Sequence, residues 1–577
     1  MYTLGINAAY HDPAACLVHD GVVVAAVEEE RFTRIKHGKR PTPFSSYELP
    51  FHAIEYCLGA AGISLMAVDH VAYSYDPYLL LGTHAGAEDI TLPLEPSSYP
   101  IPEEWKAAWD PLFLAGIVNA PRHLSSGAPH HLRERFRGAS PDGPYRWHWV
   151  PHHLAHAASA FLPSPFPRAA ILTLDGRGEQ ATTSYALGDG ADISMLDEVR
   201  MPHSLGLLYE RVTDHLGFLQ SSDEYKVMAL ASFGRPRYAD VFREIVRRGH
   251  GGQYTIDSRP LEEDFGPARR RGGPLEARHY DIARSLQEVL EETVLGLAGW
   301  LHEATGERGL CLAGGVALNC VLNARLRDVG PFERIWVQPA AGDAGTALGA
   351  ALWIDTRQRP DAGRRYQMDH AYLGPAYDDA EIEALLRWSG VAYHRMTDIP
   401  GEVADLLAAG QIVGWFQGQA EWGPRALGAR SILASPIDAG MQARLNDIKD
   451  REDFRPVAPV VIEEEAAYWF AGAGQSPFML FINDILPECV ERIPAVRHVD
   501  GTARIQTINR DQQPQYYDLL RAFAARTAVP ILINTSFNTR GEPMVLSPRD
   551  ALESFWTTPL DALAIGPFLL QKPTPAP

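Results

Sequence analysis

Cysteine is scarce in this sequence. Only five occur in 577 residues, they are widely spaced, and no two form a C-x-x-C pair. Disulfide frameworks and cysteine-ligated zinc sites depend on regularly or closely spaced cysteines. We therefore expect reduced thiols, and neither disulfides nor a cysteine-ligated zinc.

Long apolar runs are also missing. No window of the sequence reaches the roughly 18 uncharged apolar residues that a membrane-spanning helix needs. The first residues, MYTLGINAAYHDP, have neither the basic segment nor the apolar segment of a secretory signal. Together with the reduced thiols, these absences predict a cytoplasmic protein.

Positive charge is in the minority. The chain carries 52 Lys and Arg against 72 Asp and Glu, a net charge of −20 at pH 7. This balance argues against nucleic acid or an anionic membrane as a partner, although it leaves room for a local basic pocket. With 46% hydrophobic and 21% charged residues, the composition is that of a globular protein, and the length requires more than one domain.

The first part of the chain repeats one pattern. A short apolar strand over residues 2–7 precedes two apolar runs joined by Asp20-Gly21, which is a strong hairpin signal. The strand AAILTLDG is likewise followed by a hairpin around Asp189-Gly190. Two copies predict a duplicated α/β domain with a cleft between its halves; two unrelated hairpins are the alternative.

Changes in composition mark the domain limits. We predict a first domain over residues 1–357, in which residues 84–146, rich in Pro, Gly, Ser and His, form a variable insertion at the rim of the cleft. The polar and basic range 358–395 is predicted as a linker, and residues 396–570 as a second domain of mixed α/β structure. Within the first domain, residues 281–308 have the periodicity of a long helix.

Two histidines give the clearest signal for a metal. If the segment HHLAHAASAF is helical, His152 and His156 lie at positions i and i+4, so both imidazoles face the same side. The sequence has no His-Glu-x-x-His, so a zinc protease would lack its general base. Asp175 and Asp343, each just after a predicted strand, are the candidates for further ligands. The alternative is a pair of histidines hydrogen-bonded within the core.

Glycine-rich turns join strands to helices at two places. Gly314-Gly315 and Gly342–Gly345 leave room for backbone N–H groups and a helix N-terminus to approach phosphate oxygens. We therefore expect a nucleotide cleft there, with Gly314, Gly315 and Asn319 as contacts. Such turns also serve simple packing, which is the alternative.

The second domain concentrates cationic side chains in short polar turns. Arginine can bind phosphate oxygens with two parallel hydrogen bonds, so this group suits a triphosphate. Asn534, Ser536 and Asn538 follow the last strand and could add neutral donors. A solvated basic face is the alternative. The cations are Arg425, Arg430, Lys449, Arg451, Arg455 and Arg504.

A histidine and a lysine follow the first strand and the first hairpin. His11 can act as a base near neutral pH, and the neighbouring Asp12 can orient it. Lys36, in the basic turn KHGKR, could hold a phosphate or the carbonyl oxygen of an activated acyl donor. Plain surface positions are the alternative for both.

These motifs together resemble a known family, the NodU/CmcH O-carbamoyltransferases. The motifs are GINAAYHDPAACLVHDG, EEERFTRIKHGKRP, HHLAHAASAF, DEYKVMALASFG, LAGGVALNCVLN, GDAGTALGA, EWGPRALGARSIL and LINTSFNTRGEP. The resemblance runs from about residue 1 to 566 and is weakest through 84–146. It implies an ASKHA-type duplicated α/β N-terminal domain and a YrdC-like C-terminal domain.

The resemblance also implies a reaction. The YrdC-like domain would convert carbamoyl phosphate and ATP to carbamoyl adenylate, and the ASKHA-type domain would pass the carbamoyl group to a hydroxyl of a small-molecule acceptor, a natural product or a sugar. A divalent metal, usually Fe²⁺, would be held by His152, His156, Asp175 and Asp343. His11 would be the base, and Lys36 would contact the carbamoyl adenylate.

Further contacts are implied by the same resemblance. Those to nucleotide and carbamoyl phosphate in the second domain fall on Arg425, Lys449, Arg455, Arg504, Asn534 and Ser536. Those to substrate fall on Asp12, Asp223 and Lys226. The segment N-A-A-Y-H-D is shorter than in family members that act on aminoglycosides, so an aminoglycoside acceptor is not implied.

Other functions stay open at this point. One is carbamoylation of a tRNA nucleoside, against which the low positive charge argues. Another is an ASKHA-type small-molecule kinase, in which the second domain would have no evident task. A non-catalytic binding module fits two cation-rich and glycine-rich sites poorly. We expect a monomer or a homodimer.

Overall fold

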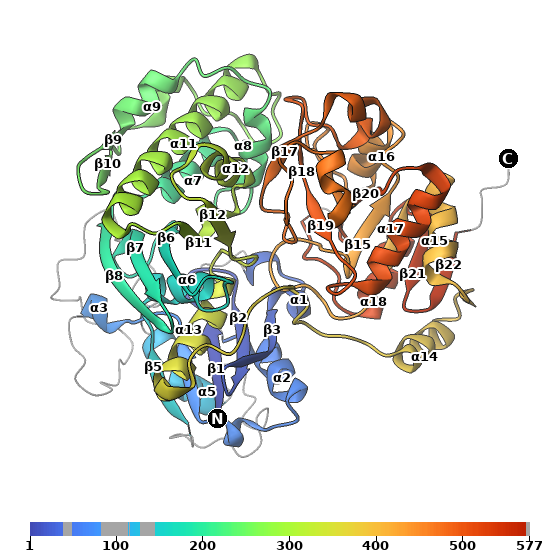
Figure 1. Ribbon diagram of the computed structural model, residues 1–577, viewed down its shortest axis with the longest axis horizontal. Coiled ribbons are helices and arrows are strands. Elements are labelled where there is room, and N and C mark those ends of the chain that lie inside the picture. Colours follow the sequence, from blue (N-terminus) through green and yellow to red (C-terminus); the bar gives the residue numbers. More distant parts are fainter. Residues whose placement is uncertain (39–48, 82–113, 115, 127–144, 540, 573–577) are drawn as a thin grey trace. The chain divides into compact units, whose positions relative to one another are not determined.

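The computed structural model describes residues 1–38, 49–81, 114, 116–126, 145–539 and 541–572 (Figure 1). Contacts within the chain divide it into two compact units. The first comprises Met1–Glu224 and Pro236–Met368, and the second comprises Tyr225–Arg235 and Asp369–Pro577. In the described ranges, no helix combines the length and hydropathy that a membrane span requires.

The first sheet of unit 1 has five strands in the order β3-β2-β1-β4-β5. Strands β1, β2 and β3 are antiparallel neighbours, whereas β4 runs parallel to β1 and β5 parallel to β4. The β2–β3 turn is Asp20-Gly21, both at positive φ, as the sequence predicts. The strands are β1 (Tyr2–Asn7), β2 (Ala14–His19), β3 (Val22–Glu28), β4 (His70–Tyr73) and β5 (Arg146–Trp149).

The second sheet of unit 1 has the same topology. Its order is β12-β11-β6-β7-β8, with β6, β7 and β8 antiparallel and with β11 and β12 parallel to β6 and to each other. The predicted duplication is therefore confirmed, strand by strand. The strands are β6 (Arg168–Leu174), β7 (Ala181–Asp189), β8 (Asp192–Arg200), β11 (Gly309–Ala313) and β12 (Arg334–Val337).

Two helices pack against each other and against the sheets, α6 (His152–Phe161) and α13 (Ala344–Gln358). Their contact depends on small residues. A Cβ added at Gly349 of α13 would lie 1.9 Å from the carbonyl oxygen of Ala155 on α6, and one at Gly5 of β1 would lie 1.9 Å from that of Ala347. Close backbone approach therefore fixes the spacing of the two helices.

Other helices complete unit 1. The predicted helix over 281–308 is present and begins earlier than expected, as α11 (Ala277–Thr305). Most of the insertion predicted over 84–146 lies outside the described residues. The remaining named helices that lie wholly in unit 1 are α1 (Glu30–Thr33), α2 (Phe51–Ala60), α3 (Tyr78–Leu81), α5 (Ala120–Ser126), α7 (Leu205–His215), α9 (Ala239–Ile245), α10 (Leu261–Phe265) and α12 (Cys320–Val329).

Unit 2 is built on an eight-stranded mixed sheet in the order β13-β22-β21-β14-β15-β20-β16-β19. The strands are β13 (His394–Arg395), β14 (Val413–Phe416), β15 (Arg430–Ala434), β16 (Ala458–Ile462), β19 (Gln506–Ile508), β20 (Ile531–Ser536), β21 (Ala562–Ile565) and β22 (Phe568–Gln571). The helices are α14 (Asp379–Ser389), α15 (Ile399–Ala408), α16 (Met441–Ile448), α17 (Pro514–Thr527) and α18 (Pro548–Thr557). All of these elements except β13 contribute to one core of buried aliphatic and aromatic side chains.

Two parts of the chain lie in unit 2 although the sequence placed them elsewhere. The range 358–395, expected as a linker, belongs to unit 2 from Asp369 onward. It contains α14 and β13, and β13 pairs with β22 at the edge of the sheet. Helix α8 (Glu224–Ala231) crosses the division between the units, because residues from Tyr225 to Arg235 make their contacts in unit 2.

Candidate active site

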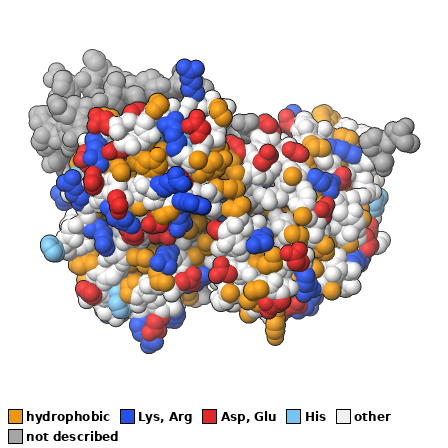
Figure 2. Space-filling model, turned by 90° about the horizontal axis from the view of Figure 1, so that it is seen from above, with side chains coloured by type: hydrophobic (Ala, Val, Ile, Leu, Met, Phe, Trp, Pro, Cys, Tyr) orange, Lys and Arg blue, Asp and Glu red, His pale blue; other side chains and the backbone are white. Residues whose placement is uncertain are grey.

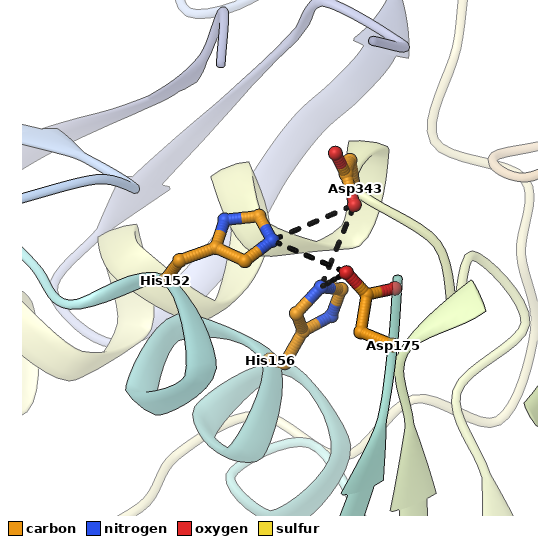
Figure 3. Close-up of side chains that lie close together, drawn as sticks. All are labelled: His152, His156, Asp175 and Asp343. Carbon is orange, nitrogen blue, oxygen red and sulfur yellow. Dashed lines mark ion pairs between the residues drawn. The ribbon is translucent and has the colours of Figure 1, made fainter. Parts of the chain in front are cut away.

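Four buried side chains of unit 1 converge on one point (Figure 3). Nε2 of His152 lies 3.6 Å from Oδ1 of Asp343 and 3.7 Å from Oδ2 of Asp175. Nε2 of His156 lies 3.6 Å from Oδ1 of Asp343 and 4.0 Å from Oδ2 of Asp175. The four ligand atoms are within 4.8 Å of one another. The four residues that the sequence predicts as metal ligands therefore do lie together in the fold.

Secondary structure explains this convergence. The two histidines occupy successive turns of α6, as the i, i+4 spacing predicts, and their rings meet edge to face with centroids 4.6 Å apart. Asp175 follows the last residue of β6, and Asp343 is the residue before α13. Because α6 and α13 touch through Gly349, the ends that carry the ligands stay close.

Hydrogen bonds orient these ligands. Nδ1 of His152 lies 3.1 Å from the carbonyl oxygen of Ser74 and therefore donates its proton there. In the neutral ring the lone pair is then on Nε2, which faces the carboxylates. Oδ1 of Asp175 accepts a 2.7 Å hydrogen bond from the backbone N–H of Gly315, so Oδ2 is the oxygen turned to the imidazoles.

The polar atoms of this group fit a metal. Among the described residues, Nε2 of His152, both ring nitrogens of His156 and both carboxylate oxygens of Asp343 are buried without a hydrogen-bond partner. Burial lowers the pKa of His152, but the Asp343 and Asp175 carboxylates outweigh it and raise that pKa well above its ordinary value. The carboxylates thus attract positive charge to this position. Two imidazoles and two carboxylates are a donor set for a divalent transition metal.

Glu179 holds the N-terminus of α6. Its Oε1 accepts hydrogen bonds from the backbone N–H of Asp76 at 2.7 Å and of His152 at 2.9 Å. Pro151, at the N-cap position, has no side chain for this purpose. The sequence gives no sign of this role, because the partners of Glu179 lie far away along the chain.

Glu179→Gln should weaken the metal centre. Glutamine keeps the size of the side chain but loses one acceptor oxygen and brings an NH2 group that cannot accept from the helix. Since partners that orient metal ligands are typically worth about 10- to 100-fold in affinity, we expect a loss in that range. Titration of purified protein with a chelator measures it, with Glu303→Gln on the exposed side of α11 as control. Unchanged affinity would remove Glu179 from this role.

His11 lies next to the four predicted metal ligands, which we call the metal group (His152, His156, Asp175 and Asp343). Its Nδ1 lies 2.8 Å from Oδ2 of Asp12, whose Oδ1 lies 2.8 Å from Nδ1 of His37. The backbone N–H of His37 donates to Oε2 of Glu30 at 2.7 Å. The other ring nitrogen of His11, Nε2, is 3.8 Å from Oδ2 of Asp343. His11 therefore contacts Asp12 through Nδ1 and faces Asp343 through Nε2.

Asp12, predicted as a substrate contact, lies between two imidazoles. Burial raises the pKa of this carboxyl, but His37 and His11 outweigh it and hold the pKa well below its usual range. Each of its oxygens contacts an imidazole, so the structure gives Asp12 an orienting position beside His11. Lys36 lies in the same turn as His37, η1 (Lys36–Gly38).

The glycine-rich turn of unit 1 is used by the protein itself. A Cβ at Gly314, whose φ is +90°, would lie 2.1 Å from the carbonyl oxygen of Leu174. Gly315 donates its N–H to Asp175, and Asn319 caps α12 by accepting from Leu322 while its Nδ2 donates to Gln287. Packing and capping thus account for these residues, and a nucleotide contact at this turn stays a prediction.

Arg430 has a structural role, which corrects our grouping of it with phosphate-binding cations. It is 1% exposed, and its guanidinium lies 3.7 Å from the ring centroid of Phe416. Its N–H groups donate to carbonyl oxygens of Pro375, Gln417, Gly418, Ala429 and Leu546. With these acceptors in place, Arg430 ties the start of unit 2 to the turn before β15.

Lys449 organises the end of β20. Its buried Nζ donates to Oγ of Ser536 at 3.1 Å and to Oδ1 of Asn538 at 2.6 Å, and to both backbone carbonyls of these residues. Asn534, on the same strand, donates to Oε1 of Gln506 at 2.8 Å. Of the polar residues selected from the sequence around β20, Ser536 and Asn538 are thus partners of Lys449, whereas Asn534 contacts Gln506.

Three arginines of unit 2 lie close together. Burial lowers the pKa of Arg451 to about 9, and the charges of Arg455 and Arg504 act in the same direction. Nη2 of Arg451 and Nε of Arg504 are buried and have no hydrogen-bond partner among the described residues. Neighbouring cations that keep buried hydrogen-bond donors are suited to an anion. Arg425 lies in the turn between β14 and β15, half-buried.

Asp223 and Lys226, taken together from the sequence, belong to different units. Asp223 closes a turn in unit 1, where its Oδ2 accepts from the N–H of Leu219 at 3.1 Å. Lys226 is part of unit 2 and forms an ion pair with Glu452 at 2.9 Å.

On the face drawn in Figure 2, acidic and basic side chains are intermixed, so the charge argument for a ligand depends on the buried groups.

Comparisons with known proteins relate both parts of the chain to carbamoyltransferases. A family model described as carbamoyltransferase N-terminus matches residues 2–79 and 146–352, and one described as carbamoyltransferase C-terminus matches residues 404–572. Nodulation protein NolNO of Sinorhizobium fredii is 40% identical over 99% of this chain and 80% of its own length. Nodulation protein NolO of Bradyrhizobium diazoefficiens is 43% identical over 73% of this chain and 78% of its own.

Two further matches are less informative about function. An uncharacterized protein of Synechocystis is 41% identical over 99% of this chain and 97% of its own length. Among solved structures, full-length HypF in its phosphate- and nucleotide-bound form aligns at 13% identity over 63% of this chain and 56% of that chain. Its TM-score of 0.34 is too low to support an argument.

Proposed function

This chain belongs to the carbamoyltransferase family, and on that premise we propose that it is an ATP-dependent O-carbamoyltransferase acting on a hydroxyl of a small-molecule acceptor. The observation that carries the proposal is the convergence of His152, His156, Asp175 and Asp343, with Nε2 of His11 turned toward them. This arrangement supports the proposal of a base beside a site for a Lewis acid, as attack by an alcohol on an activated carbonyl requires.

Two half-reactions make up the proposal. In the first, carbamoyl phosphate, ATP and water give carbamoyl adenylate, pyrophosphate and phosphate. In the second, the acceptor hydroxyl attacks the carbamoyl carbon, the bond to AMP breaks, and a carbamate ester and AMP are formed. We assign the first to unit 2, a YrdC-like domain, on the strength of its arginine group, and the second to unit 1, an ASKHA-type domain, on the strength of its repeated sheet order.

His11 has a defined task in the second half-reaction. The Asp12 carboxylate accepts from Nδ1–H, which leaves the lone pair on Nε2 to take the proton of the attacking hydroxyl. Asp12 also stabilises the imidazolium that forms, and His37 fixes Asp12 from its other side. We propose that Lys36, in the same turn as His37, holds the carbonyl oxygen of the carbamoyl group.

The metal would be held by His152, His156, Asp175 and Asp343. When bound, a divalent cation supplies a Lewis acid for carbonyl or phosphate oxygens. The donor set accepts Fe²⁺, which we propose as the native ion. Metal analysis of protein purified without added metal tests this identity.

The first half-reaction should depend on the arginines of unit 2. Arg504→Met is expected to lower carbamoyl-phosphate-dependent pyrophosphate release from ATP by about 10- to 100-fold, because a charge-assisted contact to phosphate is lost. Metal content should not change. Arg510→Met, in an exposed ion pair with Asp518, is the matched control. Undiminished pyrophosphate release from the Arg504 variant would contradict the assignment to unit 2.

A further inference from the structure

Helix α8 carries a segment of the first half of the sequence into unit 2. The match to the carbamoyltransferase N-terminus includes this helix, within residues 146–352. Residues from Tyr225 to Arg235 nevertheless make their contacts with unit 2. Sequence relationship therefore assigns the segment to one half of the protein, and packing assigns it to the other.

The segment contacts the residues that follow α16. Nζ of Lys226 lies 2.9 Å from Oε1 of Glu452, and both side chains are mostly buried, at 12% and 27% exposure. The guanidinium of Arg455 lies 4.7 Å from the ring centroid of Tyr225. The rings of Phe233 and Phe454 meet edge to face with centroids 6.4 Å apart. Three contacts over four residues, 452–455, attach the segment to this stretch.

That stretch also contains the arginine group. Arg451 and Arg455 flank Glu452, and Arg504 acts on Arg451 from β18 (Thr502–Arg504). The Glu452 carboxylate lies between two cations: Oε1 pairs with Lys226 at 2.9 Å, and Oε2 is 3.9 Å from Nη1 of Arg455. The closer partner is the lysine supplied by α8.

This geometry gives Lys226 a definite effect on its neighbours. While Lys226 holds Glu452, the carboxylate remains at the longer distance from Arg455. Without the lysine, Glu452 would be a buried carboxylate whose nearest cation is Arg455, and the two would pair. An arginine that is paired with a carboxylate is less available to a phosphate.

We propose that Tyr225 and Lys226 complete a phosphate-binding site in unit 2, in which they position Arg455 for the phosphate-bearing substrates of the first half-reaction. The inference depends on the proposed function, since it names which half-reaction the segment serves. Lys226 is a positioning residue that acts through Glu452, and Tyr225 supports the Arg455 guanidinium from its face.

The test uses full-length protein and pyrophosphate release from ATP with carbamoyl phosphate. Lys226→Met should lower kcat/KM for carbamoyl phosphate by about 10- to 100-fold, mainly through KM. Lys226→Arg, which keeps the charge, should stay within about threefold of the parent. Adding Glu452→Gln to Lys226→Met should restore about tenfold, because the competitor for Arg455 is then neutral.

Control variants distinguish a failure of this inference from a failure of the proposed function. Arg237→Met removes an exposed cation just after the segment, where it pairs with the buried Asp281, and should leave pyrophosphate release unchanged. Metal content and thermal unfolding report whether each variant is folded. If Lys226→Met does not fold, Tyr225→Leu takes its place and is expected to raise KM for carbamoyl phosphate several-fold. If Lys226→Met keeps pyrophosphate release, or if Glu452→Gln gives no rescue, the inference is wrong. If the parent shows no release that requires carbamoyl phosphate, the proposed function itself fails.

Discussion

Replacing His152 and His156 together by alanine should give a folded protein that no longer retains a divalent metal and no longer transfers carbamoyl groups. The variant loses both imidazoles of the donor set, and the loss of a direct ligand exceeds the 10- to 100-fold in affinity that is typical of supporting partners. The same variant should still release pyrophosphate, because the arginine group belongs to unit 2. Metal analysis of the purified proteins measures the primary effect.

Thermal unfolding gives a second readout that does not need catalysis. A bound metal stabilises the folded state in proportion to the logarithm of its concentration over Kd, so a chelator should lower the Tm of the parent protein. The chelator should leave the Tm of the double variant unchanged. His153→Gln, on the same helix but hydrogen-bonded to Ser184, is the matched control and should retain metal. Equal metal content in the parent and the double variant would remove these histidines from the centre.

His11→Ala should abolish carbamoyl transfer while leaving the formation of carbamoyl adenylate intact. A positioned general base contributes roughly 10²- to 10⁴-fold, and we expect the transfer rate to fall by that factor. The measurement compares two products of one incubation: the carbamoylated acceptor, by mass spectrometry, and pyrophosphate. The parent yields both, whereas the variant should yield pyrophosphate alone.

A variant of the first half-reaction, Arg504→Met, provides the comparison for His11→Ala. Arg504→Met should lower both products in parallel, since transfer consumes what the first half-reaction makes. Loss of metal would be another cause of lost transfer, so the metal content of His11→Ala must equal that of the parent. Transfer at the parental rate by a metal-loaded His11→Ala protein would show that His11 is not the base.

The metal group was predictable because local geometry determines it. Positions i and i+4 of a helix face one side whatever surrounds them, and Asp175 and Asp343 sit where strand and helix ends bring side chains to the edge of a sheet. The duplicated fold was predictable for a similar reason, since Asp20-Gly21 and Asp189-Gly190 mark equivalent hairpins in the two sheets.

Other features depend on contacts that sequence does not display. Arg430 looked like its cationic neighbours, and only the five carbonyl groups around it reveal a structural role. Glu179 supports a helix that begins 27 residues before it in the chain, by hydrogen bonds to backbone groups that no side-chain pattern encodes. Nor does the periodicity of α8 say which core its apolar residues join.

The path of α8 has a consequence for how the protein is synthesised. Lys226 and Glu452 are separated by 226 residues, so at 5–20 residues per second the lysine leaves the ribosome roughly 10 to 45 s before its partner exists. During that interval Tyr225 and Phe233 likewise lack the partners that they contact in the finished protein, Arg455 and Phe454. Unit 1 can thus be nearly complete on the ribosome while the segment Tyr225–Arg235, which lies within its sequence, still waits for the part of unit 2 that it contacts, and docking of this segment begins only after residues 452–455 have been synthesised.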